Sequence, residues 1–256
     1  MAYVTTNQFS DQLQKIGEKT LYTGSNISLD AENLKKITGD LNKFNFVDFM
    51  NALSYKKPEV KLTSNLGNLI YEKGTVINGG QTLSAAITKG TATISKIEFF
   101  KNENLVSTII DGVADGGNFT YASGIAISTN ENYTVVVTCE DGTIVKDELS
   151  IVFYNPYYFG VTNKTLDEIT GDDIAAMNKE VDGKKIKNYA YTSTNERIVF
   201  AYDRNYGLLQ SILDINSFEN ISGFEYKEIT IGTAVYYVWM TINSCYCSDF
   251  TYTFKF

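Results

Sequence analysis

Short runs of alternating apolar and polar residues fill the middle of the chain, from residue 59 to residue 153. In the clearest run, 133–139, every second residue is apolar. A period of two is typical of strands that bury one face. Turn-forming residues separate the runs at intervals of roughly ten residues, which predicts an all-β sandwich of about seven or eight strands.

The predicted strands are separated by recognisable turns. Residues 78–80 (NGG), 115–117 (DGG) and 140–142 (EDG) contain the glycines that tight connections need. Residues 101–104 (KNEN) predict a hairpin loop. The expected strands of this region are 60–62, 69–77, 83–88, 94–100, 105–110, 119–121, 133–139 and 143–153.

The only two prolines, Pro58 and Pro156, flank this region and mark predicted domain boundaries. We predict a helical anchoring or oligomerisation arm at 1–57, a β-sandwich at 58–155 and a C-terminal module at 156–256. The fold class is therefore mainly β, with a helical arm at one end and a strand-rich α+β module at the other. The C-terminal module is expected to combine one short helix within 165–181 with strands at 198–202, 224–231, 235–242 and 250–256.

The N-terminal arm is unusually rich in apolar residues. Phe9, Leu13 and Ile16 fall on one helical stripe, and Asp30 is placed to cap a second helix. The segment after that helix has more large apolar side chains than one face of a solvated helix carries. It packs either into the protein's own core or against another chain. Our hypothesis is an assembly interface made by Phe44, Phe46, Val47, Phe49, Met50 and Leu53.

The charge of the chain argues against two classes of partner. The formal net charge is −8 and the sequence contains 22 basic residues against 30 acidic ones. Nucleic-acid binding needs a basic surface that releases phosphate counterions, so we expect no nucleic acid. We also expect no membrane association, because no apolar run approaches the about 20 residues that span a bilayer. The opening residues lack a charged and then apolar leader, so we expect synthesis in a cytoplasm without a signal peptide.

Histidine is absent from the sequence. Ser-His-Asp and Cys-His catalysis and all histidine-ligated metal sites are thereby excluded. Cys139, Cys245 and Cys247 are too few for a disulfide framework, and we predict buried thiols. We expect neither a metal nor another cofactor.

Four acidic residues gather near the predicted C-terminal helix. They lack the alternating spacing of a calcium-binding loop. We therefore predict that they cap the helix, where negative charge meets the positive end of the helix dipole. These residues are Asp167, Glu168, Asp172 and Asp173.

Two further groups of residues could carry chemistry. Tyr237 and Trp239 fall on the same face of a predicted strand and form a candidate platform for stacking on a sugar, with core packing as the alternative. Asp203 and Glu225 lie beside tyrosines, and glycoside hydrolysis needs two carboxylates but no histidine. Such a pair would have to face a common substrate.

The pattern of motifs is similar to that of a known family. Tyr133 directly follows a polar turn and resembles the tyrosine corner of immunoglobulin-like and fibronectin-like sandwiches. Together, 71–75 (YEKGT), 97–99 (IEF), 133–137 (YTVVV) and 153–160 (FYNPYYFG) resemble immunoglobulin-like domains of tailed-phage virion proteins. The Cys…Trp…Cys core of antibody domains is absent, so the resemblance is to bacterial and viral relatives.

The resemblance implies a non-enzymatic structural component of a phage virion, in a head or tail appendage. Its expected partners are further copies of itself, other virion proteins and glycans on the host surface. Its expected location is the virion, after synthesis in the host cytoplasm. A carbohydrate-binding or adhesion module is the alternative interpretation, and a histidine-free glycosidase is the third.

Overall fold

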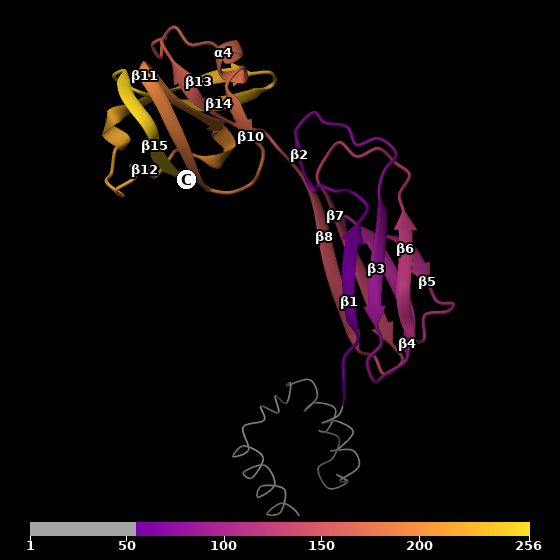
Figure 1. The fold of residues 1–256 in the computed structure, drawn as a ribbon. Coiled ribbons are helices and arrows are strands. Elements are labelled where there is room, and N and C mark those ends of the chain that lie inside the picture. The colour runs from indigo at the N-terminus through magenta and orange to yellow at the C-terminus, as the bar shows by residue number, and fades with distance from the viewer. Residues whose placement is uncertain (1–54) are drawn as a thin grey trace, which may run out of the picture.

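The computed structural model describes residues 55–256, which form two β-rich units placed end to end (Figure 1). The N-terminal unit contains β1 to β8 and the C-terminal unit contains β9 to β15. The mainly-β class predicted from the sequence is confirmed. The hypothetical assembly interface at 44–53 lies outside the described residues, as does nearly all of the predicted arm.

Eight strands of the N-terminal unit are divided between two sheets. One sheet has the strand order β1-β3-β6 and the other has the order β2-β8-β7-β4-β5. All neighbouring strands are antiparallel except β2 and β8. The strands are β1 (Glu59–Ser64), β2 (Ile70–Glu72), β3 (Thr82–Thr88), β4 (Ile94–Lys101), β5 (Asn104–Ile109), β6 (Gly116–Ala122), β7 (Glu131–Cys139) and β8 (Ile144–Tyr154).

The two sheets share a single hydrophobic core. Leu83 and Ala85 from one sheet and Val135 and Val137 from the other are completely buried in the same cluster. Along β7, buried and half-buried residues alternate over all nine positions. The period of two that the sequence shows here therefore reflects one face directed into the core.

Local backbone conformation explains two of the turns. Asn102 and Glu103 both have positive φ, 46° and 67°, as a two-residue hairpin turn requires, so the predicted loop between β4 and β5 is confirmed. The predicted strand at 69–77 is confirmed only for Ile70–Glu72. Gly74 has a φ of 93°, which takes the chain out of the extended conformation.

The C-terminal unit is organised by the 18-residue strand β11 (Ile186–Asp203). Its first part pairs with β15, whereas its last part lies between β9 and β14. Two register irregularities near Asn195, which has a φ of 79°, separate these parts. The other elements are β9 (Tyr157–Thr162), α4 (Gly171–Ala175), β10 (Asn178–Glu180), η2 (Arg204–Tyr206), β12 (Ser211–Leu213), η3 (Ile221–Gly223), β13 (Phe224–Ile231), β14 (Ala234–Thr241) and β15 (Cys245–Lys255).

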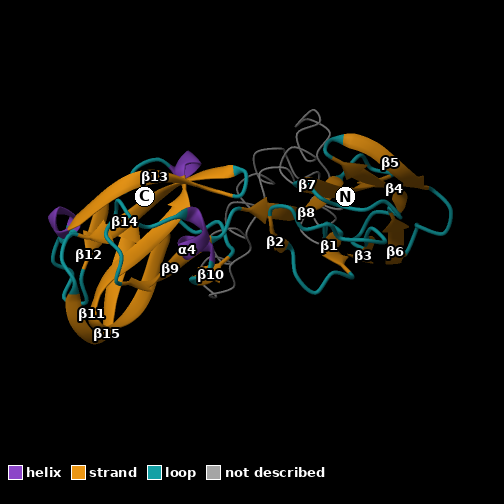
Figure 2. Cartoon of the chain, turned by 90° about the horizontal axis from the view of Figure 1, so that it is seen from above, coloured by secondary structure: helices purple, strands orange, loops and turns teal. Residues whose placement is uncertain are grey.

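Two cores lie on opposite faces of the sheet β10-β9-β11-β14-β13. One core is aromatic and is closed by β12, β15 and the first part of β11. The other core is covered by the segment that contains α4, through Leu166, Ile169 and Ile174. Figure 2 shows α4 beside the strands of this unit.

Several elements of the C-terminal unit were not predicted from the sequence. Strand β9 has no alternation because both of its faces are buried, with Tyr157 and Tyr158 exposed by only 0% and 6%. The predicted helix within 165–181 is limited to five residues, because the chain after it pairs with β9 as β10. The first part of β11 and the short β12 were also missed.

Candidate functional site at the junction of the two units

The two units are joined by only two residues, Asn155 and Pro156, which lie between β8 and β9. Proline fixes its own φ and restricts the residue before it, so the connection has little conformational freedom. On the N-terminal side, β2 ends beside the last residues of β8, where the Lys73 amide donates to the carbonyl of Tyr154 at 2.9 Å. The junction is therefore built from a stiff linker and the neighbouring strand end.

Two contacts between the units and one from the linker itself support this junction. Lys179 forms an ion pair with Glu72 at 2.7 Å, and the Asn155 amide donates a hydrogen bond to the carboxylate of Asp203. A Cβ atom on Gly183 would lie 2.5 Å from the hydroxyl oxygen of Tyr154, so this ring packs directly on the glycine. The hydrogen bond to Glu72 also raises the pKa of Lys179. The ion pair is exposed and weak by itself. Together, the three contacts favour one orientation of the two units.

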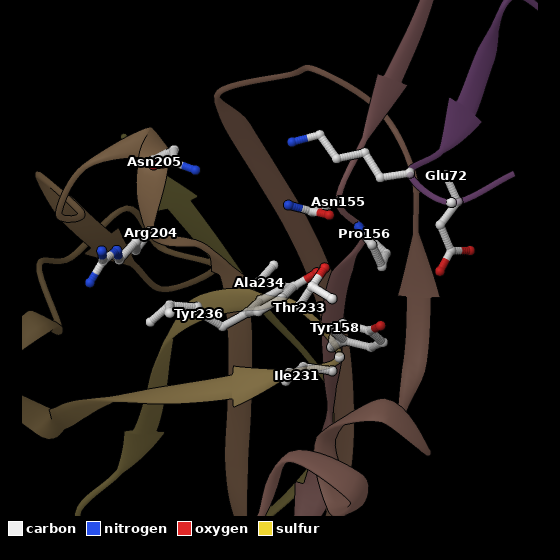
Figure 3. Close-up of a pocket in the computed structure, with 14 residues that line it drawn as sticks. Glu72, Asn155, Pro156, Tyr158, Arg204, Asn205, Ile231, Thr233, Ala234 and Tyr236 are labelled. Carbon is white, nitrogen blue, oxygen red and sulfur yellow. The ribbon is translucent and has the colours of Figure 1, made fainter. Parts of the chain in front are cut away.

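A cleft of about 620 Å³ opens at this junction (Figure 3). Figure 3 shows Arg204 and Asn205 on one side and Glu72 on the other, with Asn155 and Pro156 between them. The turn between β13 and β14 completes the C-terminal wall. Its volume lies within the about 300–1,000 Å³ of typical small-molecule sites, which also favour domain interfaces.

The deep part of the cleft is aromatic and neutral. The rings of Tyr158 and Tyr236 lie 5.6 Å apart, and both residues are almost fully buried. Burial raises the pKa of both phenols above the ordinary tyrosine value, which already keeps a phenol uncharged near neutral pH. These two tyrosines supply an uncharged floor.

A second hollow of about 250 Å³ shares Lys73, Asn155 and Asn205 with the cleft. It adds the carboxylate of Asp203, which is only 5% exposed, and the ring of Tyr206. Each carboxylate oxygen of Asp203 accepts one hydrogen bond, from the Asn155 side chain or the Asn205 amide. Because a carboxylate oxygen has two acceptor positions, Asp203 retains capacity for a further donor.

A buried ion cluster lies in the same unit, around Lys187. The Lys187 side chain is 3% exposed, contacts Asp182 and lies 3.1 Å from Glu180. Its ammonium also lies 4.2 Å from the ring centre of Tyr157, and Tyr189 donates to Glu180 at 2.6 Å. Burial favours a raised pKa for Asp182, but hydrogen bonds from Lys187 and from the Lys184 amide outweigh it, and the pKa of Asp182 is lowered.

The burial of Lys187 was not predicted, although the sequence contains a signal for it. Lys187 lies two and four residues before Tyr189 and Tyr191 on β11, so its side chain is on the same face of the strand as theirs. Both tyrosines point into the aromatic core. A lysine at an inward position of an alternating strand has to be paired in order to be buried. Recognising it required the first part of β11 to be identified as a strand.

Tyr133 departs from the predicted tyrosine corner. Its hydroxyl donates to the carboxylate of Glu131, where a tyrosine corner would use a backbone carbonyl. Glu131 is 7% exposed and forms a 2.6 Å ion pair with Lys101. Desolvation by burial and the bond to Glu131 raise the pKa of Tyr133. The hydrogen bond of Tyr133 therefore stays within β7, and its partner Glu131 connects the start of β7 to Lys101 at the end of β4.

The candidate sugar platform packs inside the C-terminal unit. Trp239 is 6% exposed, stacks on Tyr226 at 4.6 Å and donates from Nε1 to the hydroxyl of Tyr202 at 3.3 Å. Tyr237 is half-buried against the same aromatic core, while Tyr236 points to the opposite core. The two faces of β14 alternate as expected, and core packing accounts for both residues of the pair.

Asp203 and Glu225 do not face each other. Asp203 is opposite Tyr236 and Glu225 is opposite Met240, on different sides of β14. Their backbones are thus about 10 Å apart across the sheet and about 13 Å apart along it. Catalytic carboxylate pairs of glycosidases lie about 5–9.5 Å apart. Asp203 belongs to the junction hollow, and Glu225 is exposed on the edge strand β13.

Of the four acidic residues near α4, Asp173 caps this helix as predicted, Glu168 caps the preceding turn, and Asp167 and Asp172 make no such bond within the part of the chain that the structure describes. Thr170 and Asp173 form a reciprocal capping box, in which each side chain bonds to the other residue's backbone. Glu168 makes an equivalent bond to the backbone and hydroxyl of Thr165. Hydrogen bonds from Lys164 and Thr170 lower the pKa of Asp173 to about 2.

Replacing Asp173 with asparagine is expected to change the dependence of stability on pH. The folded-state pKa of about 2 is below the ordinary value of 3.8, so the charged form stabilises the folded state. This contribution is present above pH 4 and is lost as the pH falls toward 2. The difference in urea midpoint between the wild type and D173N should therefore be larger at pH 5 than at pH 2.5.

Asp172→Asn is the matched control for this measurement, because Asp172 lies in the same helical turn but makes no side-chain hydrogen bond recorded among residues 55–256. The assignment of Asp173 would be contradicted if the difference in urea midpoint between the wild type and D173N did not narrow at low pH. It would also be contradicted if D172N showed an equal difference.

The thiols lie in two environments. Cys139 is buried, as predicted, whereas Cys245 and Cys247 are half-buried on the same side of β15. Their sulfur atoms contact the carbonyls of Glu196 and Tyr191 at 3.6 and 3.5 Å. Within residues 55–256, no group of three or more potential metal-ligating side chains comes together.

Comparison with known proteins gives no relative. No protein family matches the sequence, and neither a characterised protein nor a solved structure is significantly similar to it. In the described part of the chain, no helix is long and apolar enough to cross a membrane.

Proposed function

We propose that this protein is a non-enzymatic structural component of a phage virion, in a head or tail appendage. The observation that carries the proposal is the end-to-end arrangement of the two units. The chain enters the N-terminal unit at β1, leaves it at the opposite end through β8, and continues after two residues into the C-terminal unit (Figure 1). On such a path, the end of the protein that would attach to the particle lies opposite the end that would be displayed.

The topology of the N-terminal unit supports an immunoglobulin-like sandwich at 58–155. The chain crosses between its two sheets at the connections β1–β2, β2–β3, β3–β4, β5–β6 and β6–β7. Strands that change sheets in this way around one core are typical of the Greek-key sandwiches of this class. The unit then acts as a spacer, and its stiff junction with 156–256 fixes the direction in which the C-terminal module is presented.

In this proposal, residues 1–57 attach the protein to other virion proteins or to further copies of itself. The apolar residues Phe44, Phe46 and Phe49 would supply the contact, because burial of a Phe side chain contributes about 1.5–3 kcal/mol. The C-terminal module faces outward, toward glycans of the host surface. A carbohydrate-binding or adhesion module is the second candidate function, and the polar junction cleft favours it.

The direct test is the composition of purified particles. Phage particles from the bacterium that carries this gene should contain peptides of the chain at a fixed ratio to the major head or tail protein. Antibodies against 156–256 should label those particles in electron micrographs. Peptides found only in the soluble cell fraction would contradict a structural role.

The attachment role is tested by deleting residues 1–57. The shortened protein is expected to keep a cooperative β-type unfolding transition but to be absent from particles. If the deletion unfolds the remainder while the intact chain stays monomeric, the arm belongs to the protein's core and does not attach it.

A further inference from the structure

The junction cleft and the smaller hollow that adjoins it together contain both hydrogen-bond donors and acceptors on their polar walls. The ammonium of Lys73 and the side chains of Asn155 and Asn205 supply donors, and the Asp203 carboxylate supplies acceptors. Among residues 55–256, Lys73 forms no ion pair, and its side chain is exposed. The walls therefore offer groups that can bond to a ligand without first breaking a salt bridge.

The mixture of donors and acceptors distinguishes between classes of ligand. A phosphate or sulfate ion is acceptor-rich and would be repelled by a buried carboxylate such as Asp203. An apolar ligand would leave these polar groups without partners. A sugar hydroxyl both donates and accepts, so it can bond to a carboxylate and to an amide at once.

Aromatic surface completes the match with a sugar. The Tyr206 ring lines the smaller hollow and packs against the rings of Tyr157 and Phe256, with ring centres 5.5 and 5.6 Å away. The Tyr154 ring lies in the same hollow, fixed against Gly183. Rings held in this way offer the apolar C–H face of a sugar a contact that costs little side-chain entropy.

We propose that the junction cleft, together with the smaller hollow that adjoins it, is a saccharide-binding site whose ligand contacts both units. Asp203 and Asn205 would bond to sugar hydroxyls, Tyr206 would contact a ring face, and Lys73 would bond from the N-terminal unit. This site is separate from the Tyr237–Trp239 pair, in which Trp239 is buried in the aromatic core and Tyr237 packs against that core. The proposal does not depend on incorporation into a virion, so the two can fail independently.

The test is a titration of the intact, isotope-labelled protein, followed by amide chemical shifts. The probes are chitotetraose as a neutral oligosaccharide, tetragalacturonate as an acidic one, and inorganic phosphate as an anion without sugar. At least one oligosaccharide is expected to bind with a Kd in the range of about 1 mM or below and to shift the amides of residues 73, 155 and 205. Preference for tetragalacturonate would identify Lys73 as a carboxylate contact.

Variants distinguish the cleft from other surfaces. Lys73→Ala and Asn205→Ala change exposed side chains and should each weaken binding at least tenfold, while Lys146→Ala, an exposed lysine on β8, should leave it unchanged. The proposal is overturned if neither oligosaccharide shifts these amides, if phosphate alone does so as strongly, or if all three variants bind like the wild type.

Discussion

Replacing Phe200 with alanine is expected to destabilise the C-terminal unit by about 3–5 kcal/mol, the usual cost of removing a fully buried Phe. Phe200 is completely buried and lies at the centre of the aromatic core. Its ring stacks on Phe254 at 4.1 Å and is parallel to that of Tyr157 at 6.1 Å. These rings come from the three strands β11, β15 and β9. The cavity left by the Phe200 side chain would therefore loosen the packing between the two layers of the unit.

Chemical denaturation with separate probes for the two units measures this effect. Phe218→Ala is the matched control, because Phe218 is 68% exposed and its loss should change stability by less than about 0.5 kcal/mol. Phe99→Ala removes an equally buried ring from the core of the N-terminal unit and should shift the other transition. If F200A and F99A shift one common transition equally, the two units unfold together and their cores are not energetically independent.

Replacing Lys187 with methionine is expected to destabilise the protein by about 3 kcal/mol at pH 7, because removing one partner leaves a buried charge unpaired. The change removes the cation that Asp182 contacts, and the Asp182 side chain is only 12% exposed. Lys146→Met is the control: its ion pair with Glu148 is exposed, and such pairs contribute at most about 1 kcal/mol.

The pH dependence identifies the charge that is left behind. In the wild type the pKa of Asp182 is lowered, so its stabilising contribution is present above its unfolded pKa of 3.8 and is lost as the pH falls further. Without Lys187, Asp182 should instead take up a proton readily. The stability gap between wild type and K187M should therefore be widest at neutral pH and narrow at low pH.

The double variant K187M/D182N completes this experiment. Asparagine removes the unpaired charge, so the double variant should be more stable at pH 7 than K187M alone. A gap that is independent of pH, together with no recovery in the double variant, would show that Lys187 acts through packing and not through its charge.

The sequence by itself determined most of the N-terminal unit. Its strands bury one face, so every second residue of a strand points into the core, and the sequence shows this as an alternation of period two, as in 133–139. Turn residues such as those at 101–104 fix the hairpins locally. The caps of α4 were predictable for the same reason, because Thr170 and Asp173 interact within one turn.

Only the tertiary structure decided how the strands of the C-terminal unit pair and where the cleft forms. Strand β11 bends between two layers, and its partners β9, β14 and β15 are chosen by contacts across the unit and not by its own pattern. Lys187 is buried because carboxylates from the preceding loop and strand meet it there. The cleft joins 72–74, 155–156, 204–205 and 231–236, segments that become neighbours only when distant strands pair. A local pattern specifies which face of a strand is buried, but it does not specify which distant segment covers that face.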